Sequence, residues 1–405
     1  MVSGSSCATG NDMTEQNYDV IVVGAGLMGS AAARHLAEMG VRTALVGPAE
    51  PKEKSDHTGV FASHYDQARI TRKIDKRKNW ARFSQEAIKR YPEIADKGEQ
   101  PFYTPSGAII AGTEFGEGRD FVLGAQENAV ANDVAHIPLR GAALAERFPE
   151  FSFPDGILAL YEDHDAGWIN PRLHVKAEIT AATKAGAVLY RDTVVRITEG
   201  QGTAQVHCAE GSILTGGKVI VVCGAFSKAD GLLPDPIPMR VYARTIAFFE
   251  LDKAEATRLA KMPSVIYMPP GRHEDPYILP PVLYPDGKTY IKIGGDAVDH
   301  ELETVDEMIA WFRSGGDPVA GAAIAEILVG LMPEIKYRSI TYDSCATSFS
   351  PNGNPFIYPQ TDHIIALTAG NGAAAKCADE IGRLGALVAT GGTIPAEMYE
   401  GAFAP

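Results

Sequence analysis

Continuous apolar runs alternate with segments of helical periodicity along this chain. Residues 18–24 (YDVIVVG) form an unbroken β-branched run of the kind that lies buried in a parallel sheet, and residues 41–46 (VRTALV) form a second, shorter one. Between them, residues 30–40 (SAAARHLAEMG) place apolar residues at helical spacing and end on Gly40, a residue that commonly terminates helices. Strand, turn, helix and strand therefore predict one βαβ unit.

The rest of the chain repeats parts of this pattern. Further helices are predicted over residues 173–187, 304–312 and 319–331, and a second buried strand over residues 218–225. Residues 236–300 are rich in Pro, Tyr and β-forming residues, which favours an antiparallel sheet. Residues 363–392 again predict a strand, a glycine turn and a helix.

The turn of the first βαβ unit carries a GxGxxG motif. Gly24 allows the tight turn, Gly26 lets the backbone approach a pyrophosphate, and Gly29 lets helix and strand pack closely. Because the motif lies between a strand and a helix, it predicts dinucleotide binding rather than a turn that binds nothing. The acidic residue that usually ends the second strand is replaced by Gly47, and Glu50 is the nearby candidate to replace it.

Composition restricts the classes of function. The 405 residues are 45% apolar and 22% charged, which is typical of a globular enzyme and not of a disordered chain. The net charge is 37 − 51 = −14, which argues against a nucleic-acid surface, and no apolar run is long enough to span a membrane. The N-terminus lacks the basic and apolar regions of a secretory signal, so we expect a cytoplasmic location. Five cysteines without CxxC spacing argue against disulfides or a metal site.

Five segments in order give the chain a family resemblance. Residues 63–72 read SHYDQARITR, and together with residues 18–47, 218–226, 290–295 and 345–376 they resemble the D-amino-acid-oxidase superfamily of FAD oxidoreductases. The resemblance is nearest to the branch of the monomeric sarcosine oxidases and N-methyltryptophan oxidases.

The resemblance implies an α/β fold, α+β overall, with a Rossmann-like FAD-binding domain and a second, antiparallel-sheet substrate domain. Residues 1–16 are expected to form a flexible tail. The FAD-binding domain is expected at residues 17–90, 160–235 and 335–400, and the substrate domain at residues 91–159 and 236–334.

The resemblance also assigns roles at the reacting end of the flavin. Arg69 corresponds to an arginine over the flavin ring, and Lys292 to a lysine near flavin N5 that assists the reduction of oxygen. Arg72 corresponds to the arginine that binds the substrate carboxylate, together with Lys376. A guanidinium suits that role because it pairs with a carboxylate bidentately. Other basic residues between positions 64 and 82 are expected on a solvated helix face.

Two sets of residues follow for the pocket. The substrate is expected to contact Arg72, Lys376, Tyr65, Asp296, Thr347 and Tyr277. The cofactor is expected to contact Gly24, Gly26, Leu27, Met28, Gly29, Glu50, Ser63, His64, Val195, Gly224, Cys345, Gly370, Gly372 and Lys376. In the resembling branch the cysteine is linked to the flavin by a thioether, so FAD is expected to be covalently bound through Cys345.

Several positions depart from the branch. Thr347 stands where the branch has tyrosine, Asp296 where it has histidine, and Tyr65 where histidine is common. The first two imply a roomier and more polar pocket. Lys376 lies in the first turn of a predicted helix, where the helix dipole disfavours a cation, so a compensating anion is expected.

The function implied is an FAD-dependent oxidase of a small amino or N-methylamino acid. A hydride would pass to flavin N5, the imine would hydrolyse, and oxygen would reoxidise the flavin to give hydrogen peroxide. The expected partners are a small carboxylate-bearing amine and molecular oxygen. Three alternatives stay open: a dehydrogenase that passes electrons to a carrier, a 2-hydroxy-acid oxidase, and a non-catalytic nucleotide-binding protein.

Overall fold

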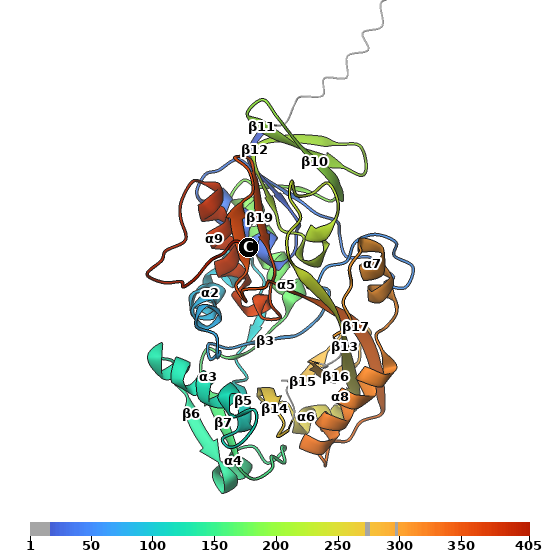
Figure 1. Cartoon of the computed structure of the whole chain (residues 1–405). Helices are drawn as coiled ribbons and strands as arrows, with labels where there is room; N and C mark the ends of the chain where they lie inside the picture. The colour runs from blue at the N-terminus through green and yellow to red at the C-terminus, as the bar shows by residue number, and fades with distance from the viewer. Residues whose placement is uncertain (1–16, 272–275, 296–298) are drawn as a thin grey trace, which may run out of the picture.

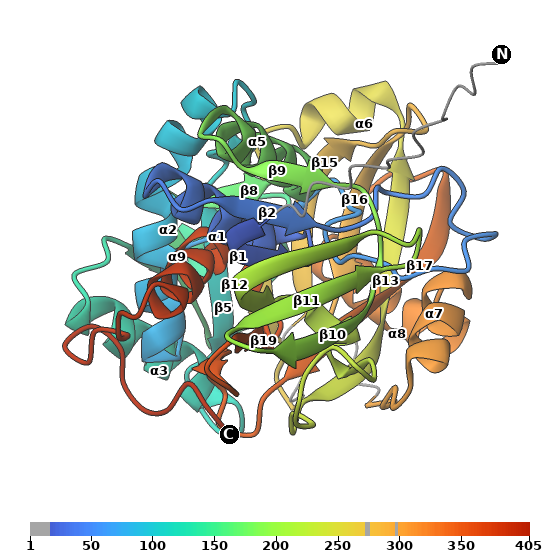
Figure 2. The ribbon, with the colours of Figure 1, turned by 90° about the horizontal axis from the view of Figure 1, so that it is seen from above.

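The computed structural model describes residues 17–271, 276–295 and 299–405. The expected N-terminal tail (residues 1–16) and Asp296 lie outside the described residues. The described chain folds around two large β-sheets with helices packed on them (Figures 1 and 2). The predicted mixed α/β fold is therefore confirmed.

The first sheet contains the predicted βαβ unit. Its central strands β1 (Asn17–Val23), β2 (Thr43–Val46), β9 (Val188–Tyr190), β12 (Ile213–Val221) and β19 (Ile364–Thr368) pair in parallel. The strands β10 (Val194–Gly200), β11 (Thr203–Cys208) and β18 (Phe356–Pro359) extend it by antiparallel pairing. Residues 20–23 and all of β2 are buried, as the apolar runs predict.

Three helices cover one face of this sheet. They are α1 (Leu27–Glu38), α5 (Pro171–Lys184) and α9 (Ala378–Ala389), and α2 (Lys78–Lys97) packs beside them. Small residues let α1 and α9 approach closely, because a Cβ added to Gly382 would lie 2.7 Å from Met28 O. Between these helices, buried Arg34 pairs with Glu178 and Asp379. The helix layer is thus held by both apolar and ionic contacts.

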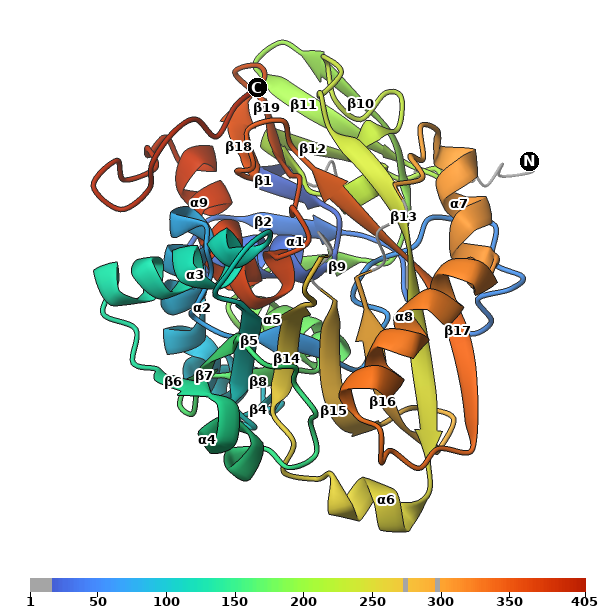
Figure 3. The same ribbon diagram turned by 60° about the horizontal axis from the view of Figure 1, so that its bottom comes forward.

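The second sheet lies on the side of the molecule opposite the first sheet (Figure 3). Its strand order is β17 (Ser339–Phe349), β13 (Arg240–Leu251), β16 (Thr289–Gly294), β15 (Tyr277–Leu283), β14 (Ser264–Met268), β5 (Ala108–Thr113), β7 (Ile157–Glu162) and β6 (Ile137–Arg140). All neighbouring pairs are antiparallel except the pair β14 and β5. Residues 236–300 therefore form the predicted antiparallel sheet within the described range.

Shorter elements complete the fold. The helices are α3 (Arg119–Ala131), α4 (Gly141–Arg147), α6 (Lys253–Arg258), α7 (Val305–Arg313) and α8 (Pro318–Leu331), with 3₁₀ turns η1 (Gly224–Lys228) and η2 (Ala374–Cys377). A third sheet joins β3 (Arg69–Thr71), β8 (Gly167–Ile169) and β4 (Tyr103–Thr104). Helix α7 starts at the capping box of Thr304 and Glu307, close to the predicted start.

Strand β17 joins the two halves of the molecule. It falls in a range expected for the FAD-binding domain, yet it pairs with β13 along its whole length in the second sheet. The division into domains stays a prediction. Within the described ranges, no helix is long and apolar enough to cross a bilayer.

We expect the substitution Gly382→Ala to destabilise the protein, because the added Cβ would fall 2.7 Å from Ala31 Cβ and from Ala32 N in the facing helix α1. Overpacking of this kind costs about 1–3 kcal/mol. Urea-induced unfolding followed by circular dichroism measures it. Gly124→Ala in α3 is the matched control, since no atom lies within 4 Å of its added Cβ. It should gain about 0.5–1 kcal/mol. Equal midpoints for the two variants would contradict this account.

Candidate active site

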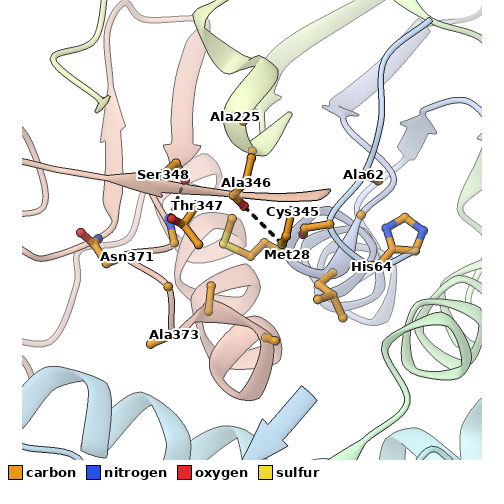
Figure 4. Close-up of a pocket in the computed structure, with 18 of the residues that line it drawn as sticks. Met28, Ala62, His64, Ala225, Cys345, Ala346, Thr347, Ser348, Asn371 and Ala373 are labelled. Atoms are coloured by element: carbon orange, nitrogen blue, oxygen red, sulfur yellow. Dashed lines mark hydrogen bonds between the residues drawn. The ribbon is translucent and has the colours of Figure 1, made fainter. Parts of the chain in front are cut away.

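A cavity of about 780 Å³ runs between the two large sheets. One end is lined by the turn that joins β1 to α1, and the other by residues of the second sheet, such as Ile110 and Tyr277. Strand β17 and the turn at residues 370–376 line the part of the cavity that joins these ends (Figure 4). The cavity therefore connects the predicted dinucleotide site with the predicted substrate site.

The glycine turn has the geometry that close approach to a ligand requires. Gly24 has φ +118°, and its added Cβ would lie 2.4 Å from Val222 O. A Cβ on Gly29 would lie 1.8 Å from Gly24 O, so helix and strand pack as the motif predicts. Gly26 precedes α1 without a side-chain cap, and Leu27 and Met28 of the first turn line the cavity. The backbone N–H groups at this helix start can serve a pyrophosphate, so the residues here fit a dinucleotide.

The end of β2 explains the missing acidic residue. A Cβ on Gly47 would lie 2.6 Å from Ala25 N, so this backbone leaves no room for a side chain there. Glu50 does not line the cavity; Arg172 binds both of its carboxylate oxygens at 2.8 and 2.6 Å. Val195 is 53% exposed and also lies outside the lining, whereas its neighbour Val194 belongs to it.

The segment after β2 places aromatic and polar groups along the cavity. Ser63, His64 and Tyr65 all line it. Burial, followed by the charges of Arg172, Arg191 and Arg69, lowers the pKa of His64 to about 3. His64 is therefore neutral at physiological pH. Tyr65 packs edge-on against His64, with ring centroids 4.6 Å apart, and donates a long hydrogen bond of 3.4 Å to Ala49 O.

Arg72 and Lys376 meet at one carboxylate oxygen. Arg72 Nη1 lies 3.2 Å and Lys376 Nζ 3.4 Å from Asp75 Oδ2. Lys376 Nζ also donates to Ser84 Oγ at 2.6 Å. Asp75 is the compensating anion expected for Lys376. Burial alone would raise the pKa of Asp75, but the charges of Arg77, Lys376 and Arg72 outweigh it and hold the pKa well below the ordinary value.

One donor atom of Arg72 stays unsatisfied by the described part of the chain in this arrangement. Its Nε is buried and has no hydrogen-bond partner among the described residues. Both Arg72 and Lys376 line the cavity. A buried donor of this kind is costly unless a ligand satisfies it. The pair therefore fits a carboxylate group.

The buried carboxylate of Glu162 holds the backbone that follows Arg72. Its oxygens accept from Lys73 N at 3.0 Å and from Ile74 N at 2.8 Å. Burial raises the pKa of Glu162 to about 7, although these two bonds and the charge of Arg72 favour the ionised form. Glu162 thus holds the backbone that positions the side chain of Arg72.

The predicted catalytic pair is held by a second aspartate. Arg69 lines the cavity and pairs with Asp66, while its Nη2 lies 4.0 Å from Cys345 Sγ. Lys292 Nζ lies 2.5 Å from Asp66 Oδ2 and 2.6 Å from Ala68 O. Lys292 is 1% exposed and stands behind the lining residues rather than among them.

The remaining predicted residues line the cavity from strands and turns. Thr347 lies in β17 with its hydroxyl buried and unpaired among the described residues. Tyr277 lies in β15, with its ring centroid 5.8 Å from Lys292 Nζ. Gly224, Gly370 and Gly372 lie on turns that border it. The structure thus gathers most of the predicted set around one cavity; Gly29, Glu50, Val195 and Lys292 lie outside its lining.

The cavity is basic in an acidic protein. The described lining holds six basic residues (Arg69, Arg72, Lys76, Arg77, Arg244 and Lys376) and two acidic ones (Asp75 and Asp299). Such a surface attracts anionic ligands. The sequence did not predict Asp66, Asp75 or Glu162 as site residues. Asp66 and Asp75 are acidic residues within a strongly basic stretch, and this contrast could have marked them. No sequence feature marked Glu162.

Comparison with known proteins shows which family the chain resembles. The family profile described as FAD dependent oxidoreductase matches residues 19–387. The monomeric sarcosine oxidase of Bacillus sp. (strain NS-129) is 30% identical over 253 residues, 61% of this chain and 62% of that protein. The match therefore spans about three fifths of that relative's length. The N-methyl-L-tryptophan oxidase of Yersinia pestis (strain Pestoides F) is 22% identical over 92% of this chain and 95% of its own.

Solved structures share the fold. NikD, an unusual amino acid oxidase essential for nikkomycin biosynthesis, superposes with a TM-score of 0.74 at 20% identity, over 96% of this chain and 98% of its own. The glycine oxidase of Bacillus cereus ATCC 14579 gives a TM-score of 0.66 at 18% identity, over 93% and 98%. The resemblance seen in the sequence is confirmed.

We expect Glu162→Gln to remove a pH-dependent part of the stability. The pKa of Glu162 is about 7 in the folded protein, against 4.5 for a glutamate in an unfolded chain. The protonated group therefore favours folding below pH 4.5, and this contribution is lost as the pH rises through 7. Relative to the variant, the wild type should lose on the order of 3 kcal/mol across this range. Urea unfolding at a series of pH values measures the difference.

The exposed Glu127→Gln is the control for this measurement, and its unfolding free energy should run parallel to that of the wild type at every pH. Parallel curves for Glu162→Gln as well would show that Glu162 ionises normally in the folded protein.

Proposed function

The chain belongs to the family of FAD dependent oxidoreductases, and on this premise we propose that it is an FAD-dependent oxidase of a small amino or N-methylamino acid. The single observation that carries the proposal is the pairing of Arg72 and Lys376 at one oxygen of Asp75, at 3.2 and 3.4 Å, on the wall of the cavity. One buried carboxylate there faces the two cations and also Arg77, so positive charge remains for a substrate carboxylate.

Part of the lining beyond this pair is apolar. Ile110, Phe121 and Ile266, from β5, α3 and β14, form a wall on the substrate side. This wall would receive the carbon substituents of the amine while the two cations bind its carboxylate. Fixing the substrate at one end in this way supplies orientation, which accounts for a large part of the rate in such reactions.

The substrate is proposed to bind as the free amine. His64 is the one histidine among the described lining residues, and burial lowers its pKa to about 3. It is therefore a poor proton acceptor at neutral pH. A neutral amine needs no base before oxidation, which agrees with this lining.

FAD, when bound, would supply the hydride acceptor for the amine, which leaves as an imine that hydrolyses, and oxygen would reoxidise the cofactor and be released as hydrogen peroxide. The glycine turn and the start of α1 would hold its pyrophosphate. Arg69, on the cavity lining, and Lys292, behind it, would supply positive charge near its ring.

We also propose a covalent link between FAD and Cys345. The thiol lies half-buried in β17, lines the cavity, and has Arg69 Nη2 at 4.0 Å. Because Cys345 lines the cavity, its sulfur can meet a flavin bound there. The cytoplasmic location stays a prediction.

Hydrogen peroxide release across a panel of amino, N-methylamino and 2-hydroxy acids tests the function. We expect release with an amino or N-methylamino acid. Arg72→Ala should raise KM for it by a factor that corresponds to a loss of about 2–5 kcal/mol of binding free energy, because a charged contact is lost. Arg82→Ala is the matched control, since Arg82 is a basic residue of the same stretch outside the described lining.

Three outcomes would overturn this assignment. Reduction of the flavin by amino acids with slow reoxidation in air would identify a dehydrogenase. Peroxide from hydroxy acids alone would identify a 2-hydroxy-acid oxidase. A colourless protein that cannot be reconstituted with FAD would identify a non-catalytic nucleotide-binding protein.

The thioether predicts that acid-precipitated protein stays yellow. Cys345→Ala should release all flavin into the supernatant, because the substitution removes the sulfur that forms the bond. Cys223→Ala is the matched control, since Cys223 also lines the cavity. The visible absorbance of pellet and supernatant measures the partition. A colourless wild-type pellet would rule out the covalent link.

A further inference from the structure

A buried carboxylate stands between the two residues proposed to act at the flavin. Asp66 is 6% exposed and lies three residues before Arg69, with which it pairs. Its Oδ2 also lies 2.5 Å from Lys292 Nζ, which comes from β16 in the second sheet. Its Oδ1 accepts a hydrogen bond from Tyr284 OH at 2.9 Å. Asp66 thus joins the loop after β2 to the region of the second sheet.

The contacts of Lys292 leave it dependent on this carboxylate. Its ammonium is 1% exposed and has two polar partners among the described residues, Asp66 Oδ2 and Ala68 O. Burial lowers the pKa of Lys292 well below its ordinary value, and the charge of Arg69 acts in the same direction. An ammonium in such a place keeps its proton only beside an anion.

We propose that Asp66 is a positioning residue that keeps the ammonium of Lys292 charged and fixed beside Arg69, and thereby governs how fast oxygen reoxidises the reduced flavin. The inference rests on the proposed function. A fixed positive charge stabilises the negative charge that develops when oxygen is reduced. Asp66 supplies neither contact nor proton to the substrate; it acts through Lys292.

Other charged and titratable groups face this pair from neighbouring elements. They are Arg69, Arg172, Asp343, Cys345, Tyr277 and Tyr284. Arg69 and Arg172 lower the pKa of Lys292, while Cys345 and Asp343 raise it. Among the described residues, however, Asp66 is the carboxylate that directly contacts the ammonium of Lys292.

The test measures reoxidation without any amine. The flavin of the holoenzyme is reduced by light and EDTA, mixed with oxygenated buffer in a stopped-flow instrument, and followed across a range of pH. In the wild type we expect the rate constant to fall on the alkaline side, where Lys292 loses its proton. In Asp66→Asn this fall should move to lower pH, with a loss of about tenfold or more at pH 8 that acidification restores.

Two further variants locate the effect. Lys292→Met should be slow at every pH, and the double variant Asp66→Asn with Lys292→Met should be no slower than Lys292→Met alone. Asp286→Asn is the matched control: Asp286 also accepts a tyrosine hydroxyl, that of Tyr290 at 2.7 Å, but is exposed and outside the described lining. It should keep the wild-type profile. Multiplied effects in the double variant would overturn the proposal.

A readout besides turnover is the visible absorbance of the oxidised flavin. Its pH titration should show a transition that moves to lower pH in Asp66→Asn and is absent in Lys292→Met. If Asp66→Asn gives no folded holoenzyme, Asp66→Glu takes its place, because the added methylene displaces the carboxylate from a 2.5 Å contact.

An unshifted profile in whichever variant folds overturns the proposal. Since the flavin is reduced photochemically, this failure is distinct from failure of the proposed function, in which no amino or N-methylamino acid in the panel reduces the flavin.

Discussion

The cavity depends on two buried carboxylates that each hold more than one cation. Asp66 contacts Arg69 and Lys292, and Asp75 contacts Arg72 and Lys376. Cations this close would repel one another in a poorly solvated space, and burial lowers the pKa of Lys292. One carboxylate between two cations removes that repulsion and still leaves an excess of positive charge. A basic cavity can therefore persist inside an acidic protein.

The backbone brings these groups together from distant parts of the chain. The loop after β2 carries Asp66, and the chain that follows β3 carries Asp75; β16 carries Lys292, and the turn before α9 carries Lys376. Strand β17 crosses from the second sheet toward the glycine turn and presents Cys345 and Thr347 to the same space (Figures 3 and 4). The site is thus built from both sheets and from the turns between them.

Local pattern predicted much of the fold. The GxGxxG turn, the first βαβ unit and the helix that begins after Thr304 depend on residues close in sequence, and each was predicted to within a few residues. The pairings of Asp66 with Lys292 and Asp75 with Lys376 span more than two hundred residues. No local periodicity encodes such contacts. The family resemblance supplied the cations because they lie in motifs, whereas their carboxylate partners stand out only as acidic residues within a basic stretch.

Gly47 has a consequence for how long a cofactor stays with the protein. Since the backbone of Ala25 occupies the space where an acidic side chain would stand, the adenosine ribose loses a customary anchor at this point. A bond from Cys345 to the opposite end of the molecule would make dissociation impossible however weak the ribose contacts are. Exchange with free FAD would then cease after the first loading. Substitutions near β2 would alter how readily the newly made chain captures FAD, and not how firmly the loaded protein retains it.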